Sequence, residues 1–334
     1  DSFSAHLMPL INSSFAPGQA QATVDAFQDP DQRQIAQAEL YYFSGHAQEC
    51  RNIAELYLQD KDLCLRLSAG LLYSFSNLTL GNPSASRMGF RNIQECLRLA
   101  EENSASEEVM ASCVFAGYLA TVLMHLPADG LPPLKDFLPY LPAGIRAYAI
   151  YILAHNAYLN EEYERALGLC QSVFLMLDGC YPIAMEYLYC VIIMCLNNQK
   201  KHEEASEILM KAWNMAKPDG FLEPFIEHHG LMLGQIEACI KPTEPENYKR
   251  LSQAVIAFSR GWMDIHNPQL QSSVTDKLTP MEFSIAMLAS KGWTNREIAD
   301  HLSMSVNTIK HYLSRIFQTL GVEKREELKP FVNK

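Results

Sequence analysis

A stretch near the end of the 334-residue chain carries hydrogen-bonding and cationic side chains at helical spacing. At 100° per residue, residues 306–320 form a helix with an apolar stripe on one side and a polar face on the other. The stripe consists of Ile309, Leu313, Ile316 and Leu320. The polar face and its flanks consist of Asn307, Thr308, Lys310, His311, Ser314, Arg315 and Gln318. Side chains of these types reach base edges and phosphate oxygens, which predicts contact with nucleic acid.

Two shorter helices are predicted to position this face. The three predicted N-caps are Thr279, Thr294 and Ser305. Pro280 suits the first helical position, and Glu282 and Glu297 complete capping boxes with the first two caps. Gly292 and Gly321 end the first and third helices. Two short helices and a longer third, with a three-residue turn at 303–305, predict a helix-turn-helix.

The stretch 278–322 resembles the LuxR-type helix-turn-helix of bacterial transcription regulators. The matching residues are Leu278, Thr279, Pro280, Glu282, Gly292, Asn295, Glu297, Ile298, Ala299, Leu302, Ser305, Asn307, Thr308, Ile309, Lys310, Leu313, Ile316, Leu320, Gly321 and Val322. The resemblance implies a four-helix DNA-binding domain whose third helix enters the major groove and whose fourth, at 323–331, pairs two copies on DNA.

By position in the family motif, the resemblance implies that Lys310, His311 and Ser314 face bases. It implies phosphate contacts for Asn295, Thr308 and Arg315, although a structural role for His311 is an alternative. The full predicted DNA-binding set is Asn295, Arg296, Ser305, Asn307, Thr308, Lys310, His311, Ser314 and Arg315.

The first helix of this stretch departs from the family pattern. Met281 stands where the family usually has Arg, and Phe283 and Met287 stand where it usually has charged residues. Other apolar residues already supply the inward face, so Phe283 and Met287 should point outward on one shared face. We expect this apolar patch to pack against the rest of the chain or against a second copy, although isolated exposed apolar residues are common.

The charge of the chain divides unevenly. The net charge is −11, but residues 275–334 hold nine Lys and Arg against seven Asp and Glu, a net +2. Residues 1–274 hold 18 Lys and Arg against 31 Asp and Glu, a net charge of −13. Basic charge in the small C-terminal part suits a DNA backbone, and the acidic remainder should be held away from it.

Residues 32 to about 258 read as almost continuous helix, whereas residues 1 to about 30 give only a weak signal. The predicted helices are 32–44, 46–59, 62–79, 86–102, 106–125, 144–159, 161–177, 182–197, 202–216, 222–238 and 246–265. Three helical hairpins carry a small residue early in the second helix, at Cys50, Ala166 and Ala205. This pattern resembles the tetratricopeptide repeat, with an irregular helical bundle as the alternative.

Residues 216–240 resemble the end of the helical-repeat sensor domain of large LuxR-type regulators related to the maltose regulator. Those regulators also carry an N-terminal ATPase module. The chain contains no G-x-x-x-x-G-K-[S/T] motif, so we expect that module to be absent from this chain or cut away.

Other reactive residue types receive structural interpretations. Glu227, His228 and His229 are spaced poorly for one metal ion, which favours surface or packing roles. Five tyrosines either line a concave ligand-binding face or pack between hairpins: Tyr148, Tyr151, Tyr158, Tyr187 and Tyr189. Nine cysteines without a CxxC pair favour a reducing compartment, and no apolar run is long enough to span a bilayer.

These observations predict an all-α protein. Residues 1–263 form a tetratricopeptide-like solenoid that senses a small molecule or a protein, residues 264–274 form a linker, and residues 275–334 form a LuxR-type domain. The expected function is sequence-specific transcription regulation on double-stranded DNA, as a cytoplasmic homodimer without catalysis, metal, cofactor or membrane contact. The alternative is a protein-interaction scaffold whose DNA-binding domain is vestigial.

Overall fold

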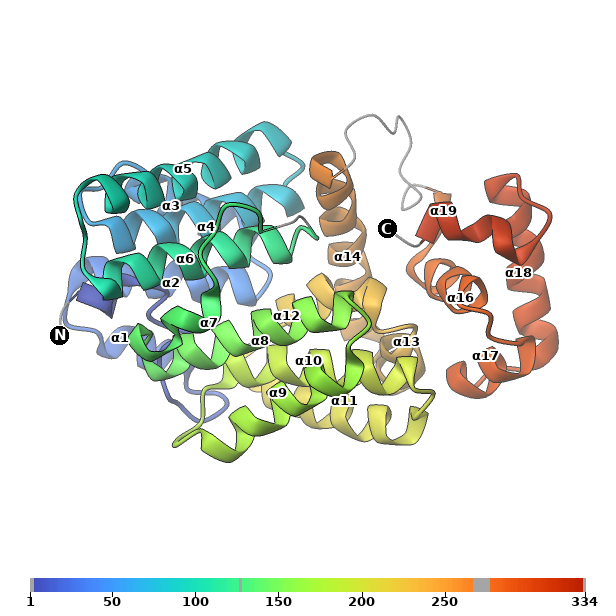
Figure 1. The fold of residues 1–334 in the computed structure, drawn as a ribbon. Helices are drawn as coiled ribbons and strands as arrows, with labels where there is room; N and C mark the ends of the chain where they lie inside the picture. Colours follow the sequence, from blue (N-terminus) through green and yellow to red (C-terminus); the bar gives the residue numbers. More distant parts are fainter. Residues whose placement is uncertain (1–2, 126–127, 267–276, 333–334) are drawn as a thin grey trace.

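The computed structural model describes residues 3–125, 128–266 and 277–332, which form helices and turns with no strand among them (Figure 1). The first helices are α1 (Ala20–Ala26), α2 (Pro30–Phe43), α3 (Ala47–Ala54), α4 (Leu63–Thr79), α5 (Pro83–Glu102) and α6 (Glu107–Val122). They are followed by α7 (Leu134–Phe137), α8 (Ala143–Leu159), α9 (Tyr163–Met176), α10 (Pro182–Asn198), α11 (His202–Ala216), α12 (Glu223–His228), α13 (Gln235–Thr243) and α14 (Pro245–His266).

The C-terminal region contains α16 (Pro280–Ser290), α17 (Asn295–Leu302), α18 (Val306–Leu320), the 3-10 turn η6 (Arg325–Leu328) and α19 (Lys329–Val332). Other 3-10 turns are η1 (Phe3–His6), η2 (Glu55–Tyr57), η3 (Leu138–Tyr140), η4 (Lys217–Asp219) and η5 (His229–Leu231). The all-α prediction is confirmed. The first three residues of the predicted linker 264–274 continue α14, and 267–274 lie outside the described residues.

The three predicted hairpins are α2–α3, α8–α9 and α10–α11, and the helices of each pair contact one another. Their turns adopt the same backbone conformation, in which Gly45, Glu161 and Lys200 all have positive φ. In each turn the next amide donates to a carbonyl five residues earlier, as in a Schellman motif. The small residues early in each second helix are fully buried, which allows close helix approach.

The N-terminal segment is part of the core, although its composition gave only a weak signal. Leu7, Leu10 and Ile11 are buried, and the amides of Leu10 and Ile11 donate to the Glu39 carboxylate at 2.7 and 3.0 Å. Burial raises the pKa of Glu39 to about 8 despite these two hydrogen bonds. The segment is positioned by contacts with α2 and α4, which no local sequence pattern reports.

The prediction of one helix at 222–238 was wrong. The chain forms α12 and η5, turns at Leu233 and Gly234, and starts again as α13. Both turn residues have positive φ, at 52° and 82°. A helical amphipathic pattern continues through this point, but Leu233 turns away from the main core and joins the core of the C-terminal region.

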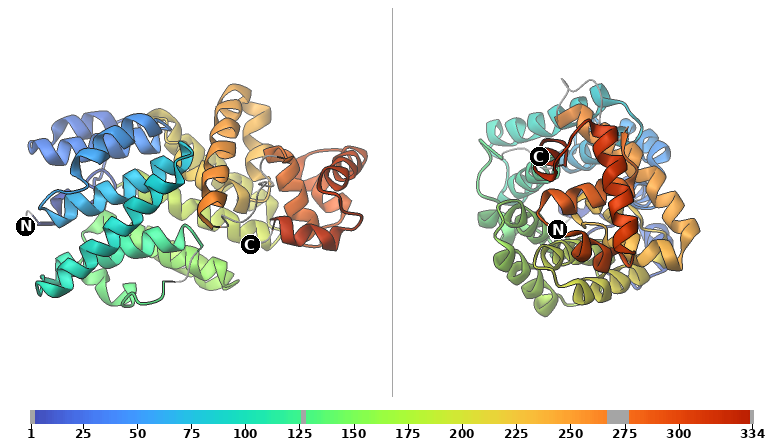
Figure 2. Two further views of the ribbon diagram at one scale, coloured as in Figure 1. Left: turned by 90° about the horizontal axis from the view of Figure 1, so that it is seen from above. Right: turned by 90° about the vertical axis from the view of Figure 1, so that its right-hand side faces the viewer.

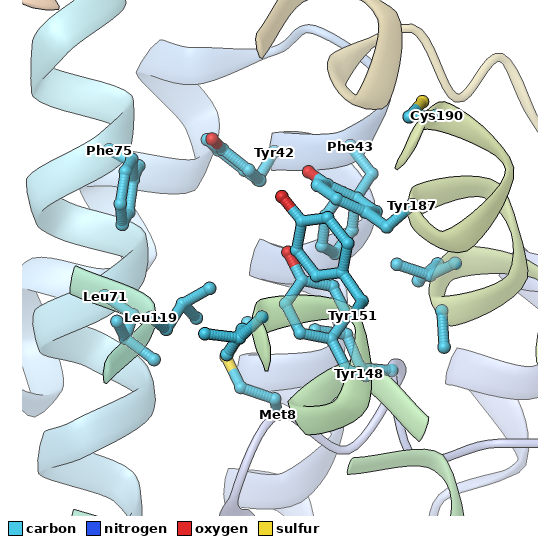
Figure 3. Close-up of a cluster of buried hydrophobic side chains, with 14 of the residues drawn as sticks. Met8, Tyr42, Phe43, Leu71, Phe75, Leu119, Tyr148, Tyr151, Tyr187 and Cys190 are labelled. Carbon is cyan, nitrogen blue, oxygen red and sulfur yellow. The ribbon is translucent and has the colours of Figure 1, made fainter. Parts of the chain in front are cut away.

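An aromatic cluster joins the two halves of the helical region (Figure 3). Rings from α8 and α10 meet residues of α2, α4 and α6, with Tyr148 and Tyr187 centred 4.9 Å apart. All five tyrosines singled out in the sequence are buried, so they pack between helices and do not line an open concave face. The packing alternative is therefore the one that this structure supports.

Two separate buried cores exist, one built by α1–α14 and one by α16–α19. The C-terminal region sits at one end of the helical array, against α13 and α14, and α18 lies on its outer side (Figures 1 and 2). None of the helices among the described residues has the length and apolar character needed to span a membrane.

Candidate nucleic-acid interface

The helix-turn-helix is formed by α17, the turn 303–305 and α18. The hydroxyl of Thr294 accepts from the Glu297 amide, and the Glu297 carboxylate accepts from the Thr294 amide at 2.7 Å. Thr279 and Glu282 form the same capping box on α16. Ser303 adopts positive φ in the turn, which closes α17 and redirects the chain into α18. The predicted caps of all three helices are confirmed.

The two faces of α18 are as the sequence predicted. Ile309, Leu313, Ile316 and Leu320 are buried in the C-terminal core. Eight of the nine predicted DNA-binding residues are exposed: Arg296, Ser305, Asn307, Thr308, Lys310, His311, Ser314 and Arg315. Ser305 caps α18 by accepting the Thr308 amide at 3.0 Å, so this hydroxyl holds the start of the helix. The result is a hydrogen-bonding ridge on a helix whose opposite side is anchored.

Arg315 has a structural partner that sequence reasoning missed. Its guanidinium contacts the Glu282 carboxylate at 2.5 Å, and it lies over the Tyr312 ring at 5.4 Å. Burial raises the pKa of Glu282, but hydrogen bonds from Thr279 and Arg315 outweigh it and leave that pKa lowered. Arg315 is still about 60% exposed, so it ties α18 to α16 while presenting charge to solvent.

Asn295 is half-buried and is engaged inside the domain. Its side-chain oxygen accepts from the Arg325 guanidinium, which also donates to the Trp293 carbonyl. Arg325 therefore joins the start of α17 to η6. The predicted fourth helix at 323–331 is a 3-10 turn followed by a single helical turn, with the Glu327 carboxylate accepting the Glu323 amide at 2.8 Å.

Residues 276–331 match the family of bacterial regulatory proteins called the luxR family. These residues are a LuxR-type helix-turn-helix domain. The chain is also similar to the HTH-type transcriptional regulator MalT of Serratia proteamaculans, at 26% identity over 155 residues, covering 40% of this chain and 17% of that protein. It is 25% identical over 143 residues to MalT of Klebsiella pneumoniae subsp. pneumoniae, and the match covers 38% of this chain and 16% of that protein. The matched parts span less than a fifth of these relatives, and no solved structure matches the chain.

The LuxR-type domain docks on the helical region through α16. Met281 and Met287 are 5% and 6% exposed, and Phe283 is half-buried. Phe283 faces Gly230, where an added Cβ would lie 3.4 Å from the ring. Phe283 therefore contacts the helical region as predicted, and Met287 lines the space between the two regions. Met281 and Met287 are buried in the core of the C-terminal region, so the expectation that the apolar patch points outward was wrong for these two residues.

A second contact joins α17 to the turn between η5 and α13. The side chain of Leu302 lies so close to Gly234 that a Cβ there would meet it at 2.6 Å. His301 Nε2 donates to the Leu233 carbonyl at 2.7 Å, which leaves Nδ1 to accept from His202 Nδ1 at 2.8 Å. Burial lowers the pKa of His301 to about 4, aided by the neighbouring His202, so this contact requires neutral His301.

Charged groups rim the same interface. Lys200 contacts the Glu297 carboxylate at 2.6 Å and lies 5.3 Å from the Trp293 ring centre. The hydrogen bond from Lys200 and those from Thr294 lower the pKa of Glu297 to about 2. Lys291 donates to the Asn198 side-chain oxygen at 3.2 Å. These contacts surround the LuxR-type domain without using the exposed ridge of α18.

The remaining candidate residues have packing roles. His228 and His229 are buried, and His229 pairs with Glu237 at 2.5 Å. Glu227 accepts from the Tyr42 and Tyr187 hydroxyls. No group of three or more possible metal ligands occurs within the described ranges, and all nine cysteines are free thiols.

Proposed function

We propose that this chain is a sequence-specific transcription regulator that reads double-stranded DNA with α18 and senses an effector with its helical region. One observation supports the DNA-binding role above the others. The polar ridge of α18 is exposed while its apolar stripe is anchored, even though the domain is docked. A helix presented in this way fits the major groove without rearrangement of its own domain.

The side chains divide by position. Lys310, His311 and Ser314 lie along the exposed ridge and would contact base edges. Arg296 and Thr308 lie near the starts of α17 and α18, where backbone amides add to the attraction for phosphate. Asn295 and Arg315 support the domain through Arg325 and Glu282, and we assign them secondary contacts with phosphate.

Docking of the LuxR-type domain on the helical region couples effector binding to DNA binding in this proposal. Phe331 and Val332 at the end of the chain line the space between the LuxR-type domain and the helical region. We propose that the same segment pairs two copies on DNA, so docking and pairing compete for it. An effector that changes docking would then change the population of paired domains, which is a coupling between two sites.

Binding of selected DNA by matched lysine variants tests this proposal. Sites would be selected by the full chain from a random duplex library, and affinity measured at two salt concentrations. Lys310→Ala should weaken binding to selected sites by about 1–3 kcal/mol, because it removes a base contact. Lys135→Ala removes the same charge from an exposed position on α7 of the helical region, and should change specific binding much less. Failure to enrich any site would favour the scaffold function instead.

A further inference from the structure

A cavity of about 510 Å³ lies between the LuxR-type domain and the helical region. Its walls are mainly apolar. Val255, Phe258 and Trp262 of α14 form one side, and Phe283 and Met287 of α16 form another. Volumes of this size accommodate drug-sized molecules, and apolar walls with a few polar groups are typical of small-molecule sites.

His155 of α8 lies at this cavity and is only 2% exposed. Neither of its ring nitrogens has a hydrogen-bond partner among the described residues. Its neighbour His228 differs, because Nδ1 contacts the Pro224 carbonyl at 2.6 Å and Nε2 contacts the Tyr151 hydroxyl at 2.8 Å. A buried polar atom without a partner is costly, which calls for a ligand or a water at His155.

The chemistry of His155 limits what that ligand is. Burial, together with His228 and His125, holds the pKa of His155 well below its usual range. The ring is therefore neutral, with one N–H donor and one acceptor nitrogen. An uncharged partner suits this setting, because most of the wall is apolar. Of the ionisable groups in the lining, Glu227 is already engaged by the Tyr42 and Tyr187 hydroxyls, and Lys277 is exposed to solvent.

We infer that this cavity binds a small, uncharged aromatic molecule carrying one hydrogen-bonding group, with that group at His155 and the ring system between α14 and α16. The ligand would contact both regions at once. It would bind the docked form more tightly than the released form, and so stabilise docking. This inference gives the proposed effector a site and a chemical class. Only the effect of the ligand on DNA binding rests on the proposed function.

The test uses the full chain and two fluorescent or competing probes. N-phenylnaphthylamine is uncharged and aromatic and carries one N–H donor, whereas phenylnaphthalene lacks that donor. N-phenylnaphthylamine should bind one per chain with enhanced fluorescence and should slow hydrogen exchange in α16. Phenylnaphthalene should displace it with lower affinity, since it leaves His155 without a partner.

Two variants and one control locate the site. Ser259→Phe places a ring at the cavity wall and should weaken binding of N-phenylnaphthylamine at least tenfold. Gln253→Phe puts the same ring at an exposed position of α14 and should leave affinity unchanged. His155→Phe should reduce affinity for N-phenylnaphthylamine about fivefold to tenfold, and should not reduce affinity for phenylnaphthalene.

Equal affinity in Ser259→Phe and the unsubstituted chain would overturn the inference, as would the absence of saturable binding. If His155→Phe changes the affinity for both probes equally, His155 makes no hydrogen bond to N-phenylnaphthylamine. The proposed orientation of the ligand in the cavity is then wrong. Hydrogen exchange in α16 of the unsubstituted chain, compared with and without N-phenylnaphthylamine, provides a check that does not depend on folding of the variants. DNA binding without any probe tests the proposed function separately, so failure of one leaves the other measurable.

Discussion

Gly234 is predicted to control docking of the LuxR-type domain. It adopts φ of +82°, and an added Cβ would lie 2.6 Å from Leu302 Cδ2 and 3.3 Å from Ser284 Cβ. Carbon atoms prefer about 3.5–4.0 Å, so Gly234→Ala requires a shift of about 1 Å at the interface. Leu302 is 4% exposed and packed within its own core, which leaves it little freedom to move aside.

The expected magnitude has two parts. Positive φ at a residue with a Cβ costs about 1–2 kcal/mol, and this part lowers stability without affecting docking specifically. Overpacking costs about 1–3 kcal/mol and is relieved when the two regions separate. A 1 Å separation would also stretch the 2.7 Å contact from His301 to the Leu233 carbonyl beyond hydrogen-bonding range. The docking equilibrium should therefore move by a factor of about 5 to 150 toward release.

Gly45→Ala provides a matched control. Gly45 has the same φ of +82°, but nothing lies within 4 Å of an added Cβ. Both variants should lose stability from backbone strain, measured as a lower Tm. Gly234→Ala alone should accelerate hydrogen exchange around His301 and increase the radius of gyration in solution scattering. If the two variants show the same exchange in α17 and the same radius, the steric account of Gly234 is wrong.

Three further outcomes are expected. Phe283→Glu should release the domain with its fold intact, because Phe283 is half-buried against Gly230 and burial of such a side chain contributes about 1.5–3 kcal/mol; unchanged exchange over α16 would contradict this. Docking should weaken by roughly 1 kcal/mol between pH 6.5 and 5.5, because the released form protonates His301 near 6.5 whereas burial lowers its docked pKa to about 4. His301→Gln should flatten this dependence, measured by exchange against pH. Sedimentation of the DNA complex should show two chains per site, with half-sites about one helical turn apart, and one chain per site would refute pairing.

Much of the DNA-binding region follows from local sequence. Capping boxes at Thr279 and Thr294, the cap at Ser305 and the stripe of α18 depend on residues within about one helical turn of each other. The same holds for the hairpin turns, where the position of the small residue follows from the pairing of adjacent helices. Such features can be predicted from the sequence because the interacting groups are neighbours in the chain.

Arg315 and Asn295 show the limit of that reasoning. Their type and position suggest phosphate contacts, and the sequence offers no sign that Glu282 and Arg325 engage them. Those partners stand 33 and 30 residues away, so only folding of the domain brings them together. The apolar character of Phe283 predicted a contact, but the partner surface at Gly230 comes from a different core.

The sequence alone determined the helical class, the three caps and the polar ridge of α18, because each depends on short-range periodicity and hydrogen bonding. Tertiary structure decided where the helix expected at 222–238 breaks, since Leu233 leaves one core for the other. It also left His155 buried without a partner beside an interdomain cavity. Burial and hydrogen-bond satisfaction depend on all surrounding elements at once, which no single stretch of the chain contains.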